Sequence, residues 1–272
     1  MYQSKASVMT PLKRLIDFRL VQFSTFIMPL FSLYWVLNMC VNFNIEQVIL
    51  FVFLAYFLGF VTTIFMHRAW THRAWTPHKY LNCIALFFYS LGCTTKSAIW
   101  CSVHRKHHRL SDTEQDPHSP YHKGKLHVMF NMYKMNWPKD LEYARDLMND
   151  SLHLWFYQHY WTVNLTLWLI LLCINVNYLF FWWAVLGFHN FKNKSFNVIG
   201  HNNSTTKKST NSILFGWLYL HGEPWHQNHH EDPTNWRFGK HWYQIDLGAK
   251  LIQLFLLLGW GQDKKYQQKD IK

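Results

Sequence analysis

Residues 47–72 read QVILFVFLAYFLGFVTTIFMHRAWTH and contain the pattern that decides the fold. The first 20 of these residues carry no charge, which is enough for an α-helix to cross about 30 Å of hydrocarbon. Two histidines, His67 and His72, follow where the apolar run ends. The stretch therefore predicts a membrane-spanning helix that carries imidazoles to one face of the membrane.

Other uncharged runs predict three further spans. Residues 20–41 lack charge, and a short polar link would join them to 47–66 as a helical hairpin. Residues 151–191 are uncharged for 41 positions, which is too long for one span and right for two around a turn at 175–177. We expect an all-α membrane protein with spans at about 20–41, 47–66, 152–174 and 178–198.

The lysines and arginines indicate which loops are cytoplasmic. The N-terminal segment holds four, residues 67–150 hold twelve and residues 192–272 hold eleven, which accounts for all 27. The two short loops on the other face hold none, so the positive-inside rule places both termini and the middle region in the cytoplasm. We expect one domain, 1–272, with a cytoplasmic helical cap formed by 67–151 and 199–272.

Two shorter apolar runs are not expected to cross the membrane. Residues 80–95 are uncharged, but a crossing there would separate the first histidines from everything after Lys96. We expect this run to be re-entrant or to lie along the interface. Residues 251–260 are too short to cross and are expected to pack on the cap.

Histidine is the most unusual component of the composition. The 18 histidines outnumber the 15 acidic residues, and half of the chain is hydrophobic. The net charge of +12 suggests an anionic partner, for which lipid headgroups or an acidic redox protein fit better than nucleic acid, because the basic residues are dispersed. None of the five cysteines forms a Cys-x-x-Cys pair, which disfavours a thiolate metal site.

Eight histidines fall into three clusters. Offsets of three and four residues place the imidazoles of the second and third clusters on one helical face each. The first pair, five residues apart, would be about 140° apart on an α-helix. The clusters are His67 and His72; His104, His107 and His108; and His226, His229 and His230.

Eight imidazoles exceed what one zinc ion needs, so the count favours two metals. Imidazole also suits iron, and redox chemistry fits a lipid-chain substrate better than hydrolysis does. Glu223 and His226 form the one Glu-x-x-His, which disfavours a carboxylate-bridged di-iron bundle. Asn197 and His201 share a helical face at the end of the last span, but spacing alone does not rank His201 above His118 or His241.

The clusters and their surroundings resemble the three histidine boxes of the integral-membrane fatty-acid desaturases, in order and spacing. The resemblance covers roughly residues 20–260 and is specific to the branch that contains the acyl-CoA Δ9 desaturases, with most similarity to bacterial members. The matching segments are HRAWTHRAW, WCSVHRKHHRLSDTEQDPHSP, FNVIGH, HGEPWHQNHH and RFGKHWYQIDLGAKL.

This resemblance implies a di-iron centre, O2 as co-substrate and a cis double bond, at Δ9, in a saturated fatty-acyl chain carried by coenzyme A. It implies no catalytic side chain beyond the metal centre, and it adds His201 as a ninth ligand and Asn197 as a ligand through water. The implied set is His67, His72, His104, His107, His108, His201, His226, His229, His230 and Asn197. The sequence departs from the animal acyl-CoA enzymes at Ser102 and Val103, where those enzymes have an Arg-Asp pair in contact with the CoA headgroup.

Desaturation of an unactivated chain needs O2 activation at a metal, together with electrons from outside. The chain has no nucleotide-binding loop, haem motif or Cys-x-x-Cys cluster, so we expect a ferredoxin, a rubredoxin or a b5-type cytochrome as donor. Lys123, Lys125, Lys207 and Lys208 are candidates for its docking surface, and contact with lipid headgroups explains them equally well.

Two further sets are named from sequence proximity to the clusters. Carboxylates that would orient the imidazoles are Asp112, Glu114, Asp116, Glu223, Glu231 and Asp232, and solvated loop charges are the alternative. Tryptophans that would line an acyl tunnel are Trp70, Trp75, Trp100, Trp217 and Trp225, and ordinary packing is the alternative.

Two other functions remain open at this point. A sibling oxygenase, such as a hydroxylase, ketolase or alkane monooxygenase, would use the same metal set and differ in its product. A metal-binding membrane transporter or sensor would perform no catalysis, and His159 and His189 lie where it could use them.

Overall fold

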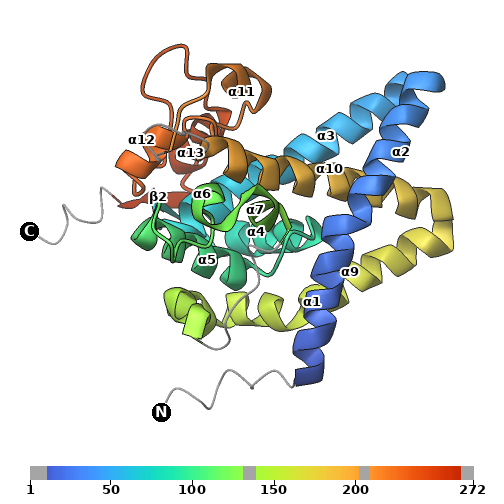
Figure 1. Cartoon of the computed structure of the whole chain (residues 1–272), viewed down its shortest axis with the longest axis horizontal. Helices are drawn as coiled ribbons and strands as arrows, with labels where there is room; N and C mark the ends of the chain where they lie inside the picture. The colour runs from blue at the N-terminus through green and yellow to red at the C-terminus, as the bar shows by residue number, and fades with distance from the viewer. Residues whose placement is uncertain (1–10, 131–138, 202–208, 265–272) are drawn as a thin grey trace, which may run out of the picture.

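The computed structural model describes residues 11–130, 139–201 and 209–264. These residues form helices almost throughout, as the sequence predicts, with one two-stranded ladder among them. Figure 1 shows long helices diverging on the right and shorter elements gathered on the left. The histidine clusters lie among the shorter elements.

The long helices follow the apolar runs of the sequence. Two stretches, Leu15–Val41 and Ile45–Thr71, are long and apolar enough to cross a membrane. The second expected hairpin has helices of 24 and 25 residues, but Trp, His, Asn and Lys side chains interrupt their apolar surfaces. The long helices are α1 (Pro11–Phe26), α2 (Met28–Val41), α3 (Ile45–Val61), α9 (Ser151–Ile174) and α10 (Val176–Gly200).

Side-chain caps fix the start of both helices in the second hairpin. Asp150 accepts hydrogen bonds from the backbone N–H groups of Leu152 and His153 at the start of α9. Asn175 separates α9 from α10 and caps α10 by accepting from the N–H of Asn177. A capping side chain satisfies one of the N–H groups that a helix start leaves unpaired.

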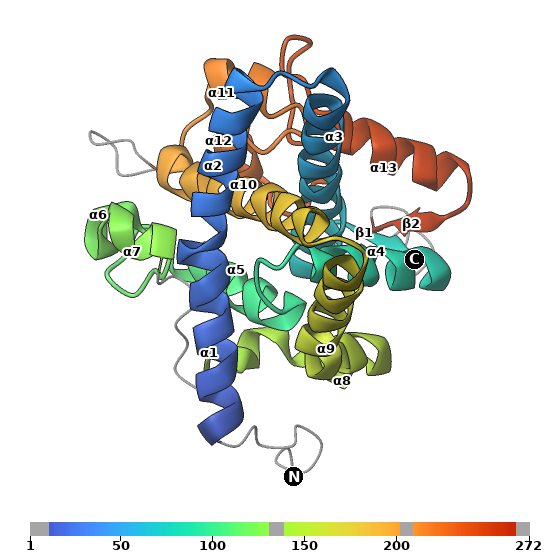
Figure 2. The same cartoon turned by 90° about the vertical axis from the view of Figure 1, so that its right-hand side faces the viewer.

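The long helices bury an apolar core at their crossing points. Helix α10 packs most extensively on α2, and Figure 2 shows the two crossing. Gly187 lies at this crossing, where a Cβ atom would overlap the carbonyl of Met28. Ser32 on α2 donates a hydrogen bond to the carbonyl of Ala184 on α10. Leu58 and Trp168 extend the same core to α3 and α9.

The first histidine pair lies on a π-helix, which corrects the sequence expectation. Helix α3 continues into η1 (Thr62–Thr71), and the His72 N–H donates to the carbonyl of His67, five residues back. A π-helix forms hydrogen bonds between residues five apart, so His67 and the His72 cap lie closer together around the axis than they would on an α-helix. The rings of His67 and His72 accordingly lie only 5.1 Å apart, centroid to centroid.

Short elements surround η1. Strand β1 follows it and pairs antiparallel with β2, so that Trp75 lies opposite Asp263. The elements are β1 (Trp75–Pro77), α4 (Lys79–Leu91), α5 (Ser97–Leu110), α6 (Pro120–Lys123), α7 (Lys125–Phe130), η2 (Lys139–Ala144), α8 (Arg145–Asn149), α11 (Ile213–Leu218), α12 (His226–Glu231), α13 (Leu247–Leu257) and β2 (Gly261–Asp263).

The two shorter apolar runs form helices that pack against these elements. Helix α4 contacts α9, α3 and η1, and it buries Ala85, Leu86 and Tyr89 while Tyr80 and Ile84 stay exposed. Its 13 residues span about 20 Å, which is less than a bilayer needs. Helix α13 packs on η1 and β2. Its place relative to a membrane stays a prediction, as does that of α4.

A buried arginine joins η1 to the C-terminal segment. Arg68 has no exposed surface, and its guanidinium contacts both carboxylate oxygens of Asp246, the nearer at 2.9 Å. It also donates to the carbonyls of Trp236 and His221 and lies 3.9 Å from the centre of the Phe238 ring. Because the donors of Arg68 diverge to three segments, one side chain holds the chain around the third histidine cluster against the first.

We predict that Asp246→Ala lowers the free energy of unfolding by about 3–5 kcal/mol, because it leaves a buried guanidinium without its counter-charge. Thermal unfolding of the detergent-solubilised protein would measure this. Lys240→Ala is the control, since it removes a comparably close ion pair, Lys240–Glu231 at 2.6 Å, from the surface. Equal loss in the two variants would contradict the structural role of Arg68.

Candidate metal centre

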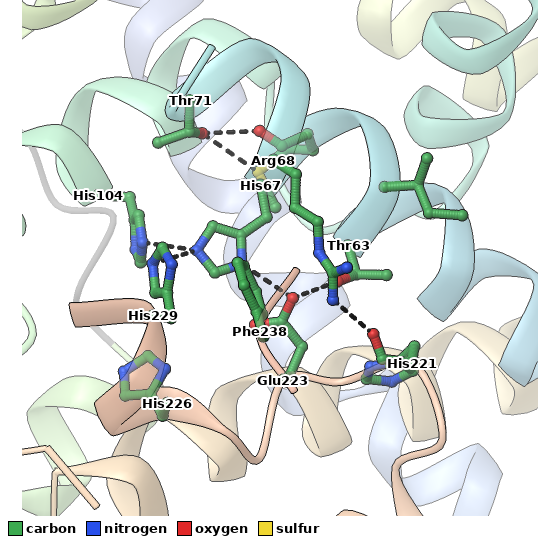
Figure 3. A network of polar contacts seen from close by, with 12 residues as sticks. Thr63, His67, Arg68, Thr71, His104, His221, Glu223, His226, His229 and Phe238 are labelled. Atoms are coloured by element: carbon green, nitrogen blue, oxygen red, sulfur yellow. Dashed lines mark hydrogen bonds and ion pairs between the residues drawn. The ribbon is translucent and has the colours of Figure 1, made fainter. Parts of the chain in front are cut away.

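Four segments bring the nine predicted histidines together. The π-helix supplies His67 and ends at His72, and α5 supplies three histidines from one face. Helix α12 supplies another three, and His201 follows the last residue of α10. In Figure 3 the rings of His67, His104 and His229 point toward one another from three different elements.

The nine imidazoles divide into two groups. Within each group the nearest ring nitrogens all lie within 4.8 Å of one another. The groups adjoin, because the rings of His108 and His230, one from each group, stack at 4.3 Å. The first group is His67, His72, His104, His108 and His229, and the second is His107, His201, His226 and His230.

The spacing of the nitrogens fits metal coordination. His67 Nε2 lies 3.0 Å from both His104 Nε2 and His229 Nε2, and His226 Nε2 lies 2.8 Å from His201 Nε2. Two ligands about 2.1 Å from a shared ion and at right angles would be separated by about 3.0 Å. His72 Nε2 is buried and has no hydrogen-bond partner among the described residues. Ring nitrogens gathered at these distances could hold a metal ion.

Burial keeps these imidazoles in the form that binds metal. Burial, and then the neighbouring imidazoles, hold the pKa values of His104 and His229 well below the usual range. The same two causes lower the pKa values of His107 and His226. A neutral ring offers its lone pair to a metal, whereas a protonated ring cannot.

Two of the six candidate carboxylates orient ligand imidazoles. Glu223 accepts a hydrogen bond from His67 Nδ1 at 2.8 Å and one from the Thr63 hydroxyl, and Figure 3 shows it between these residues. Asp116 lies 2.8 Å from His107 Nδ1. Such contacts fix the ring orientation and leave Nε2 to face the metal.

The two carboxylates differ in charge state. Burial raises the pKa of Glu223, but His67, through its charge and hydrogen bond, and the charge of Arg68 outweigh this and bring it to about 2. Burial dominates at Asp116 and raises its pKa to about 7, although the N–H groups of Asp112 and His118 oppose the rise. The metal-free protein therefore has one ionised carboxylate and one that titrates near neutrality.

The other four candidate carboxylates are placed differently. Asp112 is nearest, with its oxygen 3.9 Å from His201 Nδ1. Glu231 pairs with Lys240 and Gln227, and Asp232 accepts from Thr234. Glu114 is exposed.

A pocket opens beside the two groups. It contains about 490 Å³ of empty space, a volume that includes open solvent. Asn197 lines it next to Phe196, and the Asn197 amide donates to the carbonyl of Asn193 at 3.1 Å. The full lining is Gly59, Thr62, Thr63, Met66, His67, Trp100, His104, Asn193, Phe196, Asn197, Tyr219, His221, Glu223 and His226.

One of the five candidate tunnel tryptophans lines this pocket. Trp100 stacks on His104 with ring centroids 4.5 Å apart. Trp70, Trp75 and Trp225 are buried elsewhere and donate to Asn82, Ile64 and Ile245 respectively. The side chain of Trp217 lies outside the described residues.

Two buried histidines near the site are members of neither group. His118 stacks on His107 at 4.8 Å, and neither of its nitrogens has a hydrogen-bond partner among the described residues. His221 lines the pocket, and sequence spacing gave no reason to select it. A buried polar atom without a partner is costly, and only the three-dimensional contacts show which histidines carry that cost.

Comparisons with known proteins agree with this geometry. Residues 47–259 match the family model described as fatty acid desaturase. The chain is 32% identical over 178 residues to the Delta-9 desaturase-like 3 protein of Arabidopsis thaliana, covering 61% of this chain and 59% of that protein. It is 28% identical over 217 residues to the sn-1 stearoyl-lipid 9-desaturase of Synechocystis, covering 76% and 68%. It is 30% identical over 217 residues to the acyl-CoA 5-desaturase AL21 of Anemone leveillei, covering 76% and 67%.

The chain belongs to the fatty acid desaturase family. Within that family it is similar to the Δ9 desaturase-like proteins, as the resemblance of the histidine clusters predicts. The matched region spans about three-fifths of the length of the first of these relatives, at 59%.

We predict that Glu223→Gln and Asp116→Asn each weaken metal binding about 10- to 100-fold, because each replaces the carboxylate that orients a ligand ring with a neutral amide, which is a weaker acceptor. Competition with a chelator, followed by metal analysis, would measure the change. Glu231→Gln is the matched control: this carboxylate also adjoins the third cluster but contacts Lys240 and Gln227. Equal metal loss in all three variants would contradict the assignment.

Proposed function

We propose that the protein is an O2-dependent di-iron desaturase that inserts a cis double bond, at Δ9, into a saturated long-chain acyl group. One observation carries this proposal: nine buried or half-buried imidazoles form two adjoining groups beside a pocket, in a chain of the desaturase family. His67, His72, His104, His108 and His229 would hold one iron ion. His107, His201, His226 and His230 would hold the other, with Asn197 contributing through water.

Iron held by these residues would supply the O2-dependent oxidation that removes two hydrogens from adjacent methylene groups. The side chains of this protein position and protect that chemistry. Glu223 and Asp116 fix ligand rings by accepting from their Nδ1–H groups. Trp100 and Phe196 give the pocket apolar surface next to His104 and His226, where an alkyl chain would pack.

The relatives differ in the carrier of the acyl group, and their names include both a stearoyl-lipid and an acyl-CoA desaturase. We propose acyl-CoA as the carrier here. The headgroup would need contacts other than the Arg-Asp pair of the animal enzymes, because Ser102 and Val103 are both buried within α5. Glycerolipid is the alternative carrier, and comparing the two substrates directly would decide between them.

We propose that an external acidic donor, a ferredoxin, a rubredoxin or a b5-type cytochrome, supplies the electrons. Lys123 and Lys125 are exposed around α6 and α7, where they could meet such a protein. Lys207 and Lys208 lie outside the described residues. Arg237 and the 94%-exposed Trp242 add a basic and aromatic surface to the segment that follows α12.

We also propose four membrane spans in two helical hairpins, the first ending in α2 and α3 and the second formed by α9 and α10. Both hairpin ends would then lie on the face opposite the histidines. This arrangement is supported by the absence of lysine and arginine from the two hairpin loops and by the lengths of α9 and α10.

The native cysteines test this orientation. Cys40 and Cys173 are exposed next to the hairpin ends, whereas Cys83 is exposed on α4, between the histidine clusters. A membrane-impermeant thiol reagent added to intact cells is expected to label Cys40 and Cys173. Cys83 should react only after permeabilisation, and its labelling in intact cells would contradict the proposed sidedness.

We predict that expression in a desaturase-deficient host adds monounsaturated acyl chains, detected by mass spectrometry as the loss of two hydrogens. His226→Ala should abolish them, while His78→Ala, at an exposed histidine outside both groups, should not. A gain of one oxygen would instead identify a hydroxylase. Metal binding by purified protein with unchanged host lipids would favour the non-catalytic transporter or sensor.

A further inference from the structure

The pocket wall includes residues outside the two histidine groups. Besides His67, His104 and His226, it is lined by Gly59, Tyr219 and His221. Lys192 is not in the lining but adjoins Gly59. Gly59 has no side chain to offer, and a Cβ atom there would lie 3.0 Å from Lys192 Nζ and 3.4 Å from His221 Nε2. An ammonium and an imidazole therefore converge on the glycine that forms this wall.

Lys192 is a buried cation without a counter-charge. Its side chain is 7% exposed, and no described residue accepts a hydrogen bond from its Nζ or lies within ion-pair distance. Two rings give partial compensation, with centroids 4.8 Å away at Tyr56 and 5.5 Å away at Tyr219. Cation–π contact offsets only part of the cost of removing an ammonium from water.

His221 adds a second unsatisfied group at the same place. Its ring is 2% exposed, and neither nitrogen has a hydrogen-bond partner among the described residues. Burial, followed by the charge of Lys192, lowers its pKa well below the usual range. A neutral imidazole still has one N–H donor for an incoming acceptor.

Lys194, two residues further along α10, is a useful comparison because its ammonium has a hydrogen-bond acceptor. It is also buried, but its Nζ donates to the Thr25 hydroxyl at 2.6 Å. Burial within α10 therefore does not by itself leave an ammonium without an acceptor. Ionisable groups inside expected spans are costly and typically mark a substrate or ion site.

We propose that Lys192 and His221 form a cationic subsite beside Gly59 in the pocket wall, which binds a carboxylate carried by the substrate chain away from the carbons that face the metal groups. This inference rests on the proposed function and adds to it a preference for chains that carry an anionic oxygen group. The carboxylate would supply the acceptor that Lys192 lacks. The subsite would also fix how far the chain can advance past the metal groups.

The experiment measures ligand binding to the purified, iron-loaded full chain by thermal stabilisation. Stearate is expected to bind about ten- to hundredfold more tightly than methyl stearate, which has the same chain without a free carboxylate. Lys192→Met should abolish this difference, and Lys194→Met should preserve it. His221→Phe is a second variant, expected to reduce the difference about tenfold and available if Lys192→Met does not fold.

A second pair of ligands identifies which end of the chain carries the carboxylate. If the distal end does, stearoyl-CoA with a terminal carboxylate will bind more tightly than stearoyl-CoA. If a free fatty-acid head does, only the stearate pair will differ. Equal binding of stearate and methyl stearate, or a difference that survives in Lys192→Met, would overturn the subsite. Desaturation of host lipids tests the proposed function and does not depend on these binding results. The subsite and the proposed function can therefore fail separately.

Discussion

Nine imidazoles packed into two adjoining groups are the constraint on which this structure depends. Such a group gains nothing from the hydrophobic effect that a smaller apolar side chain would not supply, and protonation would make its members repel. Each ring must therefore be held from outside. The Glu223 contact to His67 and the Asp116 contact to His107 serve this purpose, and Arg68 ties the segment of the third cluster to that of the first.

The apolar core of long helices and the histidine groups lie in different parts of the fold. Long helices crossing at Gly187 and Met28 form a core that needs no functional residue. Helices α4, α5 and α13 and strand β1 pack against η1. The pocket lies between these regions, because Gly59 and Asn193 come from long helices while Glu223 and His226 come from the C-terminal segment.

Much of the site was predictable from local spacing. Offsets of three and four residues in α5 and α12 placed imidazoles on single faces, and the family resemblance added His201. The π-helical turn at His67 and His72 was not predictable, because its five-residue spacing reads as a splayed pair on an α-helix. The roles of His118, Lys192 and His221 were also hidden, since unsatisfied burial depends on contacts between segments far apart in sequence. The membrane topology is predicted from the distribution of lysine and arginine along the sequence.

The partner distances along the chain have a consequence for biosynthesis. His67 meets Glu223 across 156 residues, and Arg68 meets Asp246 across 178. The first imidazoles therefore leave the ribosome long before the groups that orient and anchor them exist. Loading of a metal would then have to follow translation of the segment around Glu223 and Asp246. A nascent chain that stalls before this segment would expose His67 and His72 without the groups that orient and anchor them.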